Sequence, residues 1–243
     1  MSSMFALCSG PLVVGSISHI LEGAADHDRL SSDTYKRLNL YMILYGIVNL
    51  VTRIFGGSSG GIGPLSIIAP LLLTINSIKG YGYGVLGYAK DNGKSIIEDL
   101  VNGFNSTLGI LIKINFKNLN AIGYLLASWF VVSFKFKELI NIVDIIVSNG
   151  GSNNVLTKLT GYVNYALLSC VVISLKDACD RNRLLGTTFI KLNFLSGIIF
   201  SSLSGLLLLG GSTTTMKNLG LVAGFFAGFT FGNTIKSVID KKK

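Results

Sequence analysis

The chain has few charged residues. Asp, Glu, Lys and Arg together make up 14% of its 243 residues, against about 25% in a soluble domain. Its mean hydropathy is +0.58, and apolar runs recur along its whole length. Such a composition indicates that lipid is the solvent. We therefore expect an all-α integral membrane protein.

Histidine and cysteine are also scarce. The two histidines are His19 and His27, and the three cysteines are Cys8, Cys170 and Cys179, with no C-x-x-C spacing. This pattern predicts neither a disulfide framework nor a zinc site. It also leaves little acid–base chemistry, so we expect no catalytic residue, no metal site and no enzymatic activity. The net charge of +9 comes without a basic stripe interleaved with aromatic residues, which argues against nucleic-acid binding.

One phrase, A-x-D-x-x-[KR], occurs three times. The copies are Ala24–Arg29, Ala89–Lys94 and Ala178–Arg183, and each separates two apolar runs. A shift of 154 residues, without a gap, lays the first copy and its surroundings on the third. After each phrase comes a second element, aromatic-x-x-L-N, which ends at Asn39, Asn120 or Asn193. A repeat of this kind indicates one membrane hairpin used several times.

The repeat predicts a polytopic transmembrane helical bundle with about seven spans. We expect one domain over 1–243, made of repeat 1 (4–60), repeat 2 (63–154), repeat 3 (156–215) and a closing helix (216–237). Proline and glycine in the third span predict a kink or loose winding there. Residues 94–114 have the pattern of an amphipathic helix lying at the interface. The expected spans are 4–22, 35–55, 63–88, 118–138, 156–176, 187–209 and 216–237.

The basic residues predict an orientation. Placing the three phrases and the C-terminus on one side collects sixteen of the 21 Lys and Arg residues there. The positive-inside rule makes that side cytoplasmic, stromal or matrix, with the N-terminus outside or lumenal. An organelle inner membrane or a thylakoid would suit this arrangement. The first apolar run has no basic residue before it, so we expect it to be part of the fold rather than a signal peptide.

The phrase has two interpretations. In the first it ends each odd-numbered span, because a base near a helix C-terminus interacts favourably with the helix dipole and the headgroups. In the second the acids and bases form an ion-pair ring on the inner face. The candidate residues are Asp26, Arg29, Asp91, Lys94, Asp180 and Arg183. These positions resemble the acid and base positions of P-x-[DE]-x-x-[KR] in the mitochondrial carrier family, with alanine in place of the proline. That resemblance implies a pseudo-threefold carrier.

The asparagines of the second element also have two interpretations. Asn39, Asn120 and Asn193 fall about one turn inside their helices, where an amide can bond a neighbouring helix. Alternatively they, or His19, ligate the magnesium of a chlorophyll or another pigment. Lipid is the other expected non-protein component.

The sequence favours a non-enzymatic function. We expect an accessory or scaffold subunit within a larger membrane complex, with respiratory and photosynthetic complexes as candidates. Its partners would be the lipid bilayer and other membrane subunits. The alternative is a passive small-solute transporter or channel, which the repeat geometry motivates.

Overall fold

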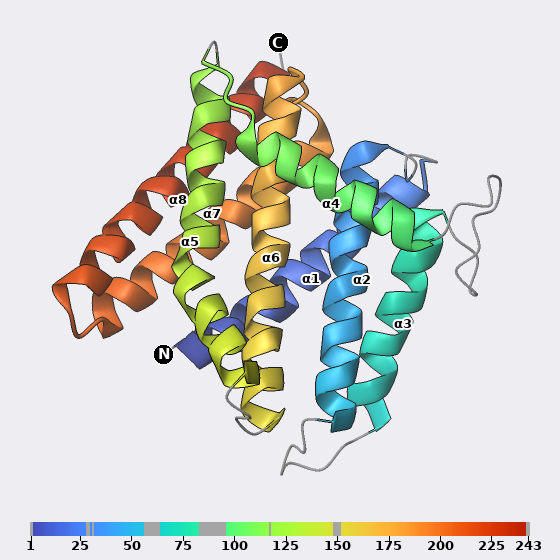
Figure 1. Cartoon of the computed structure of the whole chain (residues 1–243). Helices are drawn as coiled ribbons and strands as arrows, with labels where there is room; N and C mark the ends of the chain where they lie inside the picture. The colour runs from blue at the N-terminus through green and yellow to red at the C-terminus, as the bar shows by residue number, and fades with distance from the viewer. Residues whose placement is uncertain are drawn as a thin grey trace. The chain divides into compact units, whose positions relative to one another are not determined.

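The computed structural model describes residues 2–27, 30, 32–55, 64–82, 96–116, 118–147 and 152–241. Within these ranges the regular secondary structure is entirely α-helical, as the sequence predicts (Figure 1). The helices are α1 (Ser2–Ala25), α2 (Asp33–Phe55), α3 (Pro64–Tyr81), α4 (Ile96–Ile112), α5 (Leu119–Val147), α6 (Ser152–Asp180), α7 (Thr187–Gly210) and α8 (Thr214–Lys241).

The third helix, α3, ends next to a glycine. We expected a span over 63–88; α3 ends at Tyr81 and Gly82 adopts a φ of 108°, while residues 83–88 of that span lie outside the described residues. Only glycine enters that left-handed conformation without steric cost, so the chain leaves the helix there. The expected amphipathic segment 94–114 is the helix α4, with Glu98 and Asp99 in its first turn. Acidic side chains at that end interact favourably with the helix dipole.

Three helices in the described part of the chain are long and apolar enough to cross a membrane. They are Asp33–Phe55, Leu159–Asp180 and Thr187–Gly210. Shorter apolar helices cover Leu12–Ala25, Ile67–Tyr81 and Leu119–Ser133. These segments support membrane association, because about 20 apolar residues span the hydrocarbon core.

Contacts divide the chain into two compact units. Unit 1 comprises Met1–Ser16, Ile110–Phe130 and Val171–Lys243. Unit 2 comprises Ile17–Gly109 and Val131–Cys170. The borders fall inside helices rather than between the predicted repeats, so the division into three hairpins stays a prediction.

In unit 2, α2 and α3 lie side by side (Figure 1). Gly46 of α2 faces Thr74 of α3, and a Cβ atom on Gly46 would meet the Thr74 hydroxyl. That hydroxyl is occupied, because Thr74 Oγ1 donates to the Pro70 carbonyl at 2.7 Å. Small residues at a helix interface let the backbones approach closely. Gly46 therefore sets the spacing of this pair.

In unit 1, α7 and α8 lie side by side (Figure 1). Gly197 of α7 receives the ring of Phe231, and Ser204 Oγ donates to the Gly220 carbonyl at 2.7 Å. Aromatic side chains form a further set of contacts in this unit. The ring centroid of Phe226 lies 5.6 Å from that of Phe200 and 5.5 Å from that of Phe130, within the favourable range for aromatic pairs.

Candidate functional site

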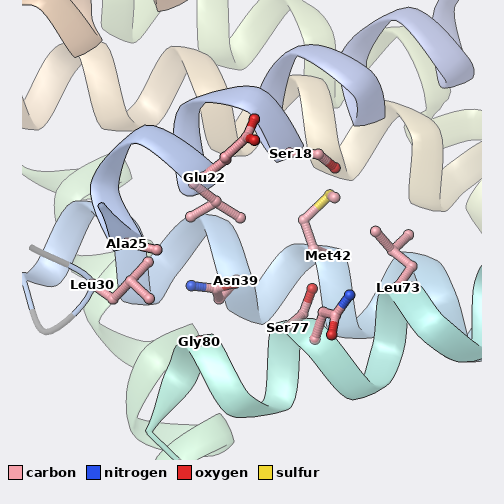
Figure 2. A pocket seen from close by; sticks show the side chains of 11 residues that line it. Ser18, Glu22, Ala25, Leu30, Asn39, Met42, Leu73, Ser77 and Gly80 are labelled. Atoms are coloured by element: carbon pink, nitrogen blue, oxygen red, sulfur yellow. The ribbon is translucent and has the colours of Figure 1, made fainter. Parts of the chain in front are cut away.

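A cavity of about 260 Å³ lies in unit 2, at the ends of α1 and α3 nearest the α1–α2 connection (Figure 2). Apolar side chains such as Leu21, Met42 and Leu73 form much of its wall. Its polar lining residues are Ser18, Glu22, Asn39, Asn76 and Ser77. Because an apolar wall with a few polar groups is the usual character of a ligand site, this cavity is the candidate site.

Asn39 is the most deeply buried polar residue of this lining. Its exposed fraction is 2%, and its amide nitrogen has no hydrogen-bond partner among the described residues. Figure 2 shows that nitrogen pointing toward Ala25 and Leu30. Gly80 lies against the amide, and a Cβ atom there would be 2.8 Å from Oδ1 and 2.9 Å from Nδ2. The Asn39 amide can therefore occupy this position only because residue 80 has no side chain.

The rim of the cavity carries a carboxylate. Glu22 is the ionisable side chain among the lining residues, and it is largely exposed. Its Oε2 atom lies 3.4 Å from Nδ1 of His19, which is exposed as well. His19 thus lies on the surface beside the rim rather than among the lining residues.

The third copy of the asparagine has a different environment. Asn193 is fully buried in unit 1, and its Oδ1 accepts a 2.6 Å hydrogen bond from the Tyr124 hydroxyl. The Tyr124 ring packs edge-on against Phe229, with centroids 5.0 Å apart. The Asn193 amide nitrogen has no partner among the described residues. An aromatic side chain therefore occupies the space beside this asparagine.

The second copy, Asn120, lies in the first turn of α5 and is partly exposed. Its backbone N–H donates to Asn118 Oδ1 at 3.1 Å, and that of Ala121 donates to the same atom at 3.3 Å. Asn118 is therefore the N-cap of α5. Asn118 is not among the predicted site residues, although an asparagine just before an apolar run is a helix-start signal.

Asp180 belongs to a buried polar cluster in unit 1. The ammonium group of Lys176, which is 1% exposed, lies 2.9 Å from Asp180 Oδ2. It also donates to the carbonyls of Ile110 and Lys113, at 2.9 and 2.5 Å. Asn115 Nδ2 donates to the other carboxylate oxygen at 3.1 Å.

This cluster caps the last turn of α4, where backbone carbonyls lack helical partners and carry the negative end of the dipole. Lys176 is not among the residues that the sequence motifs single out. The signal that identifies it is its spacing, four residues before Asp180, which puts both on one helix face.

The third phrase ends a helix. The Arg183 backbone N–H donates to the Ala178 carbonyl at 2.7 Å, and Asn182 between them has a φ of 54°. A residue in this left-handed conformation is the usual C-terminal stop. In the first phrase, Asp26 is exposed in the turn after α1. Arg29, Asp91 and Lys94 lie outside the described residues, and the ion-pair ring stays a prediction.

The described part of the chain holds no group of three His, Cys, Asp or Glu side chains placed to bind a metal ion. Comparison with family models, with curated proteins and with solved structures found no match.

Proposed function

We propose that the chain is a non-enzymatic integral membrane protein, an accessory subunit that packs within a larger membrane complex. The observation that carries this proposal is the outer face of α8. Leu221 and Phe225 are exposed there, with exposed fractions of 62% and 67%. Gly228 and Gly232 share that face, and a Cβ atom on either would meet no described atom within 4 Å.

The glycines of α8 recur every fourth residue, from Gly220 to Gly232. With 3.6 residues per turn, each glycine lies about 40° further round the helix than the one before, so the row turns from α7 toward the outer face. The first two pack against α7, because Gly220 lies against Leu208 and Gly224 lies against Ser204 of that helix. Helices in lipid associate through such small residues, since apolar area alone gives no advantage over lipid. The two open glycines therefore support contact with a helix of another subunit.

The predicted orientation belongs to the same proposal. The phrases and the C-terminus would lie on the cytoplasmic, stromal or matrix side, which the distribution of basic residues supports. Protection of single engineered cysteines from a membrane-impermeant thiol reagent, at Asp26 and at Arg181, tests it. Labelling of the two positions from opposite sides would overturn the predicted topology.

The test of assembly is purification from native membranes in a mild detergent. We expect the chain to run in a complex larger than itself, and Gly228→Ile to reduce its share in that complex. Gly109→Ile is the matched control, because Gly109 is also open but lies on α4. An absorption spectrum of the complex reports bound pigment.

A chain that migrates alone and conducts solutes in liposomes would replace this proposal with the transport alternative.

A further inference from the structure

The buried amide nitrogen of Asn39 calls for an acceptor. A donor withdrawn from water without a partner is costly, and folded proteins pair nearly all such groups. The Asn39 nitrogen lies at the wall of a cavity of about 260 Å³ and has no protein partner among the described residues. An oxygen atom supplied by a ligand in the cavity would satisfy it.

The rest of the lining narrows the chemistry of that ligand. Leu21, Met42 and Leu73 offer apolar contacts, whereas Ser18 and Ser77 offer hydroxyl groups. The Glu22 carboxylate at the rim repels an anionic headgroup and accepts a hydrogen bond from a hydroxyl. These groups together suit an uncharged amphiphile that has a carbonyl oxygen, a hydroxyl group and an apolar tail.

Size and position agree with this chemistry. A cavity of about 260 Å³ is many times the minimum of about 15 Å³ that holds one water molecule, so it has room for a group of several heavy atoms such as a glycerol unit with an ester carbonyl. The cavity lies at the last turns of α1 and α3, beside the connection to α2. In the proposed membrane orientation that is the interfacial level, where lipid ester and hydroxyl groups are found.

We propose that this cavity binds the head of an uncharged glycerolipid, with the Asn39 amide donating to its ester carbonyl and Glu22 accepting from its hydroxyl. The inference rests on the membrane location in the proposed function, but not on assembly with other subunits. It is tested on the purified chain in detergent, where a failure of assembly has no effect.

The probe is a diazirine-bearing dioleoylglycerol, with photolabelled peptides identified by mass spectrometry. We expect labelling on the lining of α1 to α3, displaced by unlabelled dioleoylglycerol. Asn39→Leu removes the donor and is expected to reduce labelling about tenfold, which is the value of one hydrogen bond to a buried group. Asn193→Leu is the matched control, since it changes the equivalent residue of the third copy and should leave labelling unchanged.

Two further variants keep the proposal open to refutation. Should Asn39→Leu fail to fold, Ser77→Met fills the cavity from α3 and is expected to abolish labelling. A diazirine-bearing oleic acid, anionic at pH 8, should label weakly, and Glu22→Gln should strengthen its labelling. Equal labelling of folded wild type and Asn39→Leu would overturn the proposal, as would equal labelling by the neutral and the anionic probe.

Discussion

The first and third copies of the repeat use the same sequence element in two different ways. Asn39 and Asn193 occupy equivalent positions, 154 residues apart, and both are buried. Beside Asn193 the neighbouring helix supplies Tyr124, which fills the space and bonds the amide oxygen. Beside Asn39 the neighbouring helix supplies Gly80, and a cavity remains. In the third copy the asparagine thus bonds a neighbouring helix, whereas in the first copy the Asn39 amide nitrogen faces a cavity.

The same contrast continues two turns further along. Gly46 in the first copy becomes Phe200 in the third under the same shift. Gly46 allows a close approach of backbones, and Phe200 lies in a cluster of aromatic rings. Two segments with the same sequence pattern thus both form helices, but the helix that packs against each one determines whether an equivalent position is filled by close backbone contact or by a large side chain.

The largest expected effect comes from removing that volume in the third copy. Phe200 is fully buried between Phe130 and Phe226. Phe200→Ala leaves a cavity the size of a ring, and such truncations cost about 4 kcal/mol. The free energy of unfolding, measured by titration with sodium dodecyl sulfate in mixed micelles, checks it. A loss below about 1 kcal/mol would contradict the aromatic closure.

The next largest effect should separate the aspartate of the third phrase from that of the first. Asp180→Asn removes the counter-ion of the buried Lys176 ammonium, and breaking a buried pair from one side costs about 3 kcal/mol. Asp26→Asn is the matched control, because Asp26 is exposed and such a change usually stays within about 0.5 kcal/mol. The same titration measures both variants. Equal losses of unfolding free energy in the two variants would show that the two aspartates have equal structural roles.

Gly46→Ala tests the close approach in the first copy. The added Cβ would meet the Thr74 hydroxyl and lie 3.1 Å from the Pro70 carbonyl oxygen, a backbone atom that cannot turn aside. Overpacking of this kind costs about 2 kcal/mol. Gly80→Ala is the informative companion, because the three atoms nearest to its Cβ all belong to the Asn39 side chain, which has a cavity to move into. We expect a smaller loss for that variant in a thermal-unfolding comparison.

Sequence reasoning was sufficient where periodicity and length decide the structure. The all-helical prediction is confirmed in the described residues, and α4 lies within the segment 94–114 whose apolar pattern predicted a helix. The end of α3 at Tyr81 depended on a single left-handed glycine inside an apolar run, which hydrophobicity does not reveal. The sequence did not predict the cavity either, because the cavity depends on Gly80 of α3 facing Asn39 of α2. That pairing follows from tertiary packing rather than from spacing along the chain.

The smallest expected effect separates the two asparagines directly. Asn193→Leu leaves the Tyr124 hydroxyl buried without its acceptor, and an orphaned buried hydroxyl costs about 1.5 kcal/mol. Asn39→Leu removes an amide nitrogen that has no partner among the described residues, so in detergent free of glycerolipid we expect no loss of stability. Adding dioleoylglycerol should then stabilise wild type and the Asn193→Leu variant, but not the Asn39→Leu variant, because ligand binding to the folded state raises its stability. A lipid-dependent gain in all three chains would place the binding site elsewhere and remove the distinction between the two copies.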